Sequence, residues 1–187
     1  MGFFQSDVLV PVFRRIERAH LPELPTCAAA EADWTLPGFA GKTRLRTTFG
    51  DLPVEALRVN DPLVTPQGRV LKVRRIDRIG LDRGFLLARP SAQPVLIPEN
   101  ALGRGLPMQD MLVSPAQELE LRSATPQAHK SRADRLTRNP LIATAFHGVM
   151  TYFTLDLGED AVILAEGVPV RVPMRNAADR DAFGEED

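Results

Sequence analysis

From Thr35 onward, apolar and polar residues alternate over short stretches, and Pro, Gly, Asn or Asp interrupts them every few residues. A period of two indicates a β-strand, because successive side chains of a strand point to opposite faces of the sheet. The 16 prolines and 13 glycines also break up any long helix. The pattern predicts an all-β fold of roughly ten short strands. The strands are expected in the stretches KTRLRTT, PVEALRVNDPLVT, RVLKVRRIDRI with a bend near Arg74, GFLLAR, PVLIP, MLVSPAQELELR, GVMTYFTLDL and DAVILAEGVPVRV.

The remaining stretches follow other patterns. VFRRIERAH has apolar positions at helical spacing, and TCAAAEADW after it ends at Trp34, which we expect to anchor this arm on the domain. The polar, arginine-rich residues 123–140 predict a long loop. We therefore predict an N-terminal helical arm at residues 1–35, a β-domain at 36–172 and an acidic disordered tail at 173–187.

Length and charge set further bounds. The 187 residues suffice for one domain with a sizeable core, and 23 basic against 24 acidic residues leave a net charge of -1. This balance gives no electrostatic reason to expect a nucleic-acid partner. Cys27 is the single cysteine, which excludes an intrachain disulfide. The sequence predicts no membrane span and shows no signal peptide, so the compartment stays open, with the cytoplasm as the default.

Candidate catalytic groupings are few. His20, His129 and His147 lie at no spacing that suits a metal site, and no phosphate-binding or dinucleotide-binding motif is present. We therefore expect neither a metal nor a cofactor. The corner SPAQ at residues 114–117 is more informative, because a short apolar strand leads into it and an alternating strand leaves it. Loops and corners between rigid strands are where working side chains gather, and Gln117 stands at this one.

Three stretches, in order, resemble the bacterial branch of the Hint domains, the fold shared by hedgehog autoprocessing domains and inteins. The first is GFAGKTRLRTTFGDLPVEALRVNDPLVTPQGR, with its VEAL, ND and LVT elements. The second is VLIPENALGRGLPMQDMLVSPAQELEL, and the third is VMTYFTLDLGEDAVILAEGVPV. Together they span about residues 36–170. The resemblance implies a Hint-like curled β-fold for the predicted domain.

The resemblance also implies where self-processing chemistry would lie. Hint domains use a Cys or Ser at their first residue, a histidine in the SPxH corner and a histidine in the closing strand. The corresponding positions here hold Gly38, Gln117 and Thr154. A glycine cannot attack, and an amide cannot exchange protons near neutral pH. The resemblance therefore implies a degenerate member that lacks the usual nucleophile and catalytic histidines.

We expect the old active-site cleft to remain as a binding or assembly surface for a protein partner or for self-association. The residues expected around it are Gly38, Thr43, Ser114, Gln117, His147 and Thr154. Arg69–Arg78 and Lys130–Arg138 are further candidate contact surfaces. The first alternative is an autoprocessing endopeptidase that uses Thr43 or Ser114 as nucleophile, with His147 as base. The second is an all-β fold unrelated to Hint.

Overall fold

The computed structural model describes residues 33–122 and 128–174, so most of the predicted arm and tail lies outside the described residues. Strands dominate this part of the chain. They are β1 (Phe39–Ala40), β2 (Arg44–Thr47), β3 (Gly50–Pro53), β4 (Pro62–Val64), β5 (Val70–Lys72), β6 (Arg75–Leu81), β7 (Val95–Ile97), β8 (Met111–Val113), β9 (Glu118–Arg122), β10 (Ala128–Arg132), β11 (Ala143–Thr144), β12 (Met150–Asp156), β13 (Ala161–Ala165) and β14 (Val168–Val172). The helices are α1 (Arg83–Ala88), α2 (Ala133–Leu136) and the 3-10 turns η1 (Val54–Ala56) and η2 (Pro90–Ala92).

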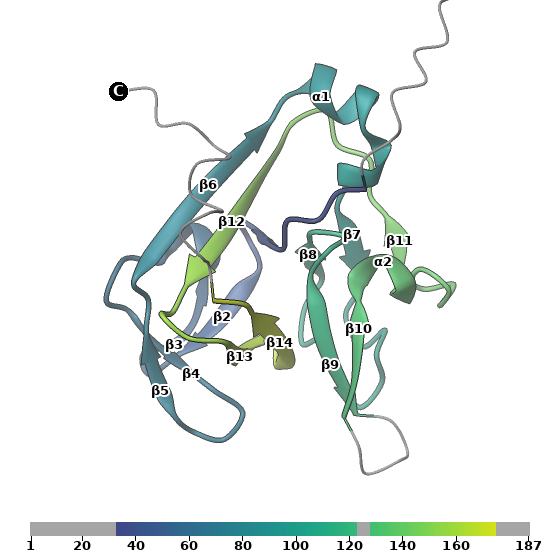
Figure 1. The fold of residues 1–187 in the computed structure, drawn as a ribbon. Coiled ribbons are helices and arrows are strands. Elements are labelled where there is room, and N and C mark those ends of the chain that lie inside the picture. Colours follow the sequence, from purple (N-terminus) through teal and green to yellow (C-terminus); the bar gives the residue numbers. More distant parts are fainter. Residues whose placement is uncertain (1–32, 123–127, 175–187) are drawn as a thin grey trace, which may run out of the picture. The chain divides into compact units, whose positions relative to one another are not determined.

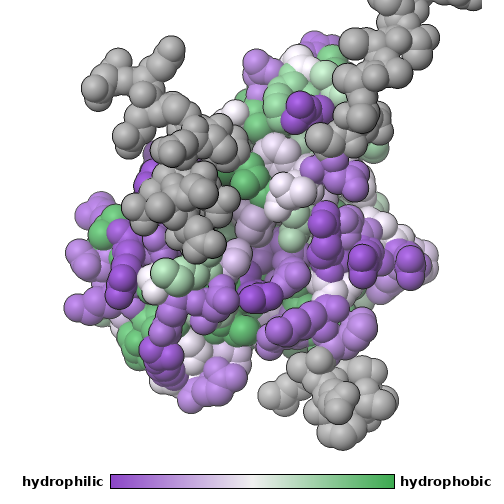
Figure 2. Space-filling view, in the orientation of Figure 1, coloured by the Kyte–Doolittle hydropathy of each residue, from purple (hydrophilic) through white to green (hydrophobic). Residues whose placement is uncertain are grey.

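The strands form two antiparallel sheets, which confirms the all-β prediction. A 6-stranded sheet has the order β11-β7-β8-β1-β12-β6. An 8-stranded sheet has the order β10-β9-β14-β13-β2-β4-β5, with β3 paired to β2. Figure 1 shows the long β6–β12 pair rising to α1, and the β9–β10 pair standing apart from it. On the face drawn in Figure 2, hydrophilic side chains prevail and hydrophobic ones form small groups between them.

Two hydrophobic clusters bury both faces of β1 and β12. The larger one gathers residues from both sheets, among them Phe39 and Phe153. The smaller one packs Trp34, Ala40 and Tyr152 together with α1. Consecutive residues of β12 are therefore buried, and its burial does not follow the simple alternation of a strand with one wet face. This double burial fixes β1 and β12 in place, and the candidate site lies beside them.

Two sequence predictions are wrong. GFLLAR forms helix α1 and not a strand, because Asp82 caps it: Asp82 Oδ1 accepts a hydrogen bond of 2.7 Å from the Phe85 N–H. Residues 123–140 are not one long loop, since β10 and α2 occupy much of that stretch. β10 pairs with β9 from Ala128 to Arg132. The polar composition of this stretch predicted a loop, and pairing with the neighbouring strand makes it a strand instead.

Glu166 lies in the turn between β13 and β14 and is buried. Its Oε1 accepts a hydrogen bond of 2.8 Å from the Arg44 N–H. Burial raises the pKa of the Glu166 carboxyl above its usual value, and the bond from Arg44 offsets only part of that effect. The turn thus carries a carboxyl whose protonation differs between the folded and unfolded chain.

We expect Glu166→Gln to remove part of the pH dependence of stability. The folded state holds the Glu166 proton more tightly than the unfolded chain, so this residue contributes stability at low pH. The contribution is lost as the pH rises from the unfolded pKa, about 4.3, through the raised folded pKa. Wild type should therefore lose stability relative to Glu166→Gln across that interval. Urea unfolding at a series of pH values would measure the difference, and the exposed Glu99→Gln is the control. If the free energy of unfolding changed with pH in the same way for wild type and Glu166→Gln, the expectation would be wrong.

Candidate functional site

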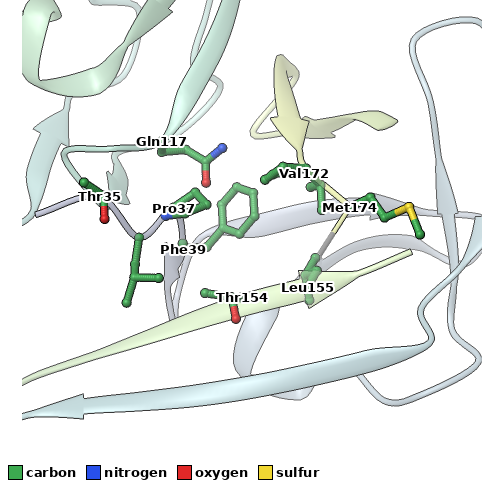
Figure 3. A pocket seen from close by; sticks show the side chains of 11 residues that line it. Thr35, Pro37, Phe39, Gln117, Thr154, Leu155, Val172 and Met174 are labelled. Carbon is green, nitrogen blue, oxygen red and sulfur yellow. The ribbon is translucent and has the colours of Figure 1, made fainter. Parts of the chain in front are cut away.

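The structure brings Gly38, Gln117 and Thr154 to one cleft of about 200 Å³. Gly38 precedes β1, Gln117 precedes β9, and Thr154 lies within β12. Figure 3 shows Gln117 on one side of the cleft and Thr154 on the other, with Pro37 between them. The 11 lining residues are Thr35, Leu36, Pro37, Gly38, Phe39, Gln117, Thr154, Leu155, Val172, Pro173 and Met174.

The backbone closes tightly around Gly38. Its carbonyl accepts a hydrogen bond of 2.9 Å from the Ser114 N–H, and the next residue, Phe39, pairs with Phe153 of β12. A Cβ atom at Gly38 would lie 3.2 Å from Tyr152 Cβ, 3.3 Å from the Phe153 carbonyl oxygen and 3.4 Å from Thr154 Cγ2. These distances are shorter than ordinary carbon contacts. Any side chain at position 38 therefore requires β12 to give way slightly.

Gln117 is a fully buried structural link. Its Nε2 donates a hydrogen bond of 2.7 Å to the Arg171 carbonyl on β14. Its backbone N–H donates to the Ser114 carbonyl, and its own carbonyl accepts from the Ala133 N–H at the start of α2. In Figure 3 the amide oxygen of Gln117 points toward Pro37. The amide thus holds the corner against β14 and presents an acceptor to the cleft.

Ser114, which was also expected at the cleft, is fully buried, does not line it and holds the segment that leads into it. Its hydroxyl donates to the Leu36 carbonyl and accepts a hydrogen bond of 2.9 Å from Trp34 Nε1–H. The Trp34 ring packs against Phe85 and Tyr152 in the smaller hydrophobic cluster. Residues 34–38 are therefore fixed by one serine and one buried ring, and Trp34 anchors this segment on the domain.

Two further residues expected at the cleft do not line it. The Thr43 hydroxyl donates a hydrogen bond of 2.9 Å to the Leu112 carbonyl and lines a separate hollow. The His147 side chain is exposed, and its backbone N–H and carbonyl bond the Gln93 side chain at 2.9 and 3.2 Å. Val172, Pro173 and Met174 also line the cleft, and the sequence analysis did not predict this. Their local sequence carries no information about which distant segments they lie against.

The cleft has an unusual electrostatic character for a reactive site. None of the described side chains that line it is ionisable, and apolar ones predominate. Within residues 33–122 and 128–174, no group of three or more His, Cys, Asp or Glu side chains could hold a metal ion. In the same ranges no helix is long and apolar enough to cross a membrane.

The basic stretches named as candidate contact surfaces are partly neutralised. Arg75 pairs with Asp77 at 2.6 Å, and Arg69 pairs with Glu159 at 2.7 Å. In the second stretch one such pair joins an arginine of β10 to an aspartate of α2 at 2.8 Å. These pairs reduce the net charge that either surface offers to a partner, and pairs at a protein surface are worth little stability.

Comparisons with known proteins now identify the family. The sequence model described as "Hint domain" matches residues 37–171. Similar solved structures include a DnaB intein from Synechocystis sp. PCC 6803, with 14% identity, a TM-score of 0.47 and coverage of 74% of this chain and 100% of that chain. The gp41-1 intein has 10% identity, a TM-score of 0.46 and coverage of 73% and 98%. The MchDnaB-1 intein has 13% identity, a TM-score of 0.46 and coverage of 71% and 98%. A search of curated proteins found no significant match. Because the family model spans most of the chain, this protein belongs to the Hint domain family.

Proposed function

We propose that this Hint domain does not process its own backbone and instead uses the cleft at Gly38 as a binding or assembly surface. The observation that carries the proposal is the lining of the cleft, in which residues 33–122 and 128–174 place no thiol and no ionisable side chain. Self-processing needs both a nucleophile on the residue whose nitrogen leaves and a group that exchanges protons near neutral pH. Gly38 and Gln117 supply neither.

The neighbouring hydroxyls do not replace the missing nucleophile. An acyl shift through a five-membered ring requires the hydroxyl or thiol on the residue that follows the scissile carbonyl, which is Gly38 for the carbonyl of Pro37. Thr35 lies upstream of that bond. Thr154 belongs to another strand, so attack from its hydroxyl would not follow the family's ring geometry.

The rival function, autoprocessing by an unconventional nucleophile, gains no support from the contacts of its candidate residues. Ser114 Oγ donates to the carbonyl of Leu36, one residue before Pro37, and it accepts from Trp34. Thr43 Oγ1 donates to Leu112. Within the described part of the chain, neither hydroxyl forms a hydrogen bond with a histidine, which an activated nucleophile would need.

The size and polarity of the cleft indicate what it binds. Its volume of about 200 Å³ lies below the range of about 300–1,000 Å³ that is usual for small-molecule sites. Its walls are apolar apart from the Gln117 amide and the Thr35 and Thr154 hydroxyls. These properties favour one small uncharged side chain of a protein partner, or of a second copy of this chain, over a whole metabolite.

The test is the intact mass of the purified protein, followed over days with and without dithiothreitol. We expect wild type to keep its full mass under both conditions. A strong thiol attacks an ester or thioester carbonyl and releases the nucleophile's hydroxyl or thiol, so a slow reaction would appear as a fragment. A wild-type fragment would refute the proposal, and its new N-terminus would identify the nucleophile.

The double variant Gly38→Cys with Gln117→His is the positive counterpart. We expect it to be cleaved after Pro37, because it restores a thiol and a titratable imidazole at the two positions. Gly38→Ala is the matched control, since it adds the same tight Cβ contact without a thiol and should remain at full mass. A folded double variant that stays intact would show that these positions are not the family's reactive ones.

A further inference from the structure

A second cavity, of about 680 Å³, lies beside the 8-stranded sheet and shares no lining residue with the cleft. Its walls come from the loop between β7 and β8, the β9–β10 pair, the β13–β14 hairpin and the turn before β5. Most of the lining side chains are apolar: Pro66, Leu102, Leu106, Leu121, Leu164, Val168 and Pro169. The volume falls within the range of about 300–1,000 Å³ that small-molecule sites occupy.

The loop that walls this cavity is held by its own backbone. The Leu102 N–H donates to the Leu106 carbonyl at 2.9 Å, and the Leu106 N–H donates to the Gly103 carbonyl at 3.1 Å. At the base of the loop, Asn100 Oδ1 accepts a hydrogen bond of 2.8 Å from the Gly105 N–H. The wall is therefore formed before any ligand arrives, which reduces the ordering cost of binding.

Arg104 lies at the tip of this loop in a strained backbone conformation. Its φ is 56°, between Gly103 and Gly105 with φ of 79° and 74°. A left-handed conformation costs a residue with a side chain roughly 1–2 kcal/mol, a cost that glycine avoids. Arg104 lines the cavity, and among the described residues its guanidinium forms no ion pair. The fold therefore holds a cation at the edge of an apolar cavity at some cost in stability.

Two other ionisable side chains line the cavity. Glu120 stands directly opposite Lys130 in the β9–β10 register, but among the described residues the two side chains form no ion pair, so the carboxylate adds negative charge to the cavity wall. His129 stands opposite Leu121 in the same pair of strands. Arg104 is the one permanent cation among the described residues that line the cavity, and His129 adds a hydrogen-bond donor.

We propose that this cavity binds a small amphipathic carboxylate, whose aliphatic chain lies on the leucine and proline walls and whose carboxylate meets Arg104. The guanidinium matches a carboxylate in charge and in its paired hydrogen-bond geometry. Apolar contact along the chain supplies most of the affinity, and Arg104 selects the anionic end. This site is independent of the cleft at Gly38 and of the proposed function.

The test compares three ligands that share the same eight-carbon chain and differ in the charge of the head group: octanoate, octan-1-ol and octylammonium. We expect octanoate to bind about tenfold more tightly than octan-1-ol, and octylammonium to bind most weakly. Titrations followed by amide chemical shifts would measure each Kd and locate the site. The largest shifts should fall on the loop around Arg104 and on Leu164, while the Gln117 amide should not move.

Two charge variants give opposite expected results. Arg104→Asn keeps a residue that tolerates the left-handed conformation, and it should weaken octanoate about tenfold and leave octan-1-ol unchanged. Glu120→Gln removes the competing carboxylate and should tighten octanoate by a few-fold. Equal affinity for octanoate and octan-1-ol, unchanged octanoate binding in Arg104→Asn, or shifts that map to Gln117 would each overturn the proposal.

Discussion

Replacing Trp34 with alanine is expected to lower the free energy of unfolding by about 3–5 kcal/mol, the usual cost of deleting a buried aromatic side chain. Trp34 is 8% exposed, and its ring centroid lies 6.0 Å from that of Phe85 and 5.9 Å from that of Tyr152. Its indole N–H also bonds Ser114. The variant loses both the packing and the polar anchor, and urea unfolding followed by circular dichroism would measure the loss.

Trp34→Phe is the matched control for this variant. It keeps an aromatic ring against Tyr152 and removes the hydrogen bond to Ser114, so we expect a smaller cost of about 1–2 kcal/mol. The Ser114 hydroxyl keeps the Leu36 carbonyl as its acceptor in both variants. A Trp34→Ala protein as stable as wild type would show that this segment adds nothing to the folded core.

Replacing Gly167 with alanine is expected to cost about 1–3 kcal/mol, because a backbone penalty combines with a smaller packing penalty. Gly167 has a φ of 80°, and a left-handed residue with a side chain costs roughly 1–2 kcal/mol. An added Cβ would also lie 2.9 Å from Leu106 Cδ2, the end of a half-buried side chain that can turn away, so this contact should add less than the roughly 1–3 kcal/mol of overpacking in a rigid core. Chemical denaturation would measure the sum of the two.

Gly68→Ala separates the two penalties. Gly68 has a φ of 81°, and a Cβ there meets no atom within 4 Å, so this variant reports the backbone cost alone. We expect Gly167→Ala to destabilise the fold more than Gly68→Ala does. The difference between the two costs is the packing penalty. Introducing Gly167→Ala into a Leu106→Ala background should reduce its cost to that of Gly68→Ala. Equal costs for Gly167→Ala and Gly68→Ala in the wild-type background would exclude a contribution from Leu106.

Two residues at the cleft use their chemistry to hold the fold together. Gln117 uses its amide to bond the Arg171 carbonyl, so the corner is tied to β14 by a group that does not titrate. Gly38 lets the backbone of β12 approach closely. Both residues therefore have structural roles at these positions, and this supports the proposal that the cleft binds rather than reacts.

The alternation of apolar and polar residues, together with turn residues, predicted most of the strands. Both signals depend only on residues a few positions apart in the sequence. RVLKVRRIDRI became β5 and β6 with a break at residues 73–74, where its apolar positions leave strict alternation. The failure at α1 also has a local cause. A short apolar run such as GFLLA fits a strand or a helix equally well, and the Asp82 cap decides between them.

The sequence by itself determined the fold class and the family resemblance, and it singled out three positions for the candidate site, since these depend on local order along the chain. Only the tertiary structure decided that the end of β14 walls the cleft at Gly38, Gln117 and Thr154, three residues that the resemblance had already grouped. It also placed Thr43 and His147 elsewhere. The order of strands in a sheet depends on pairing between distant segments, and alternation within one strand carries no information about its neighbour.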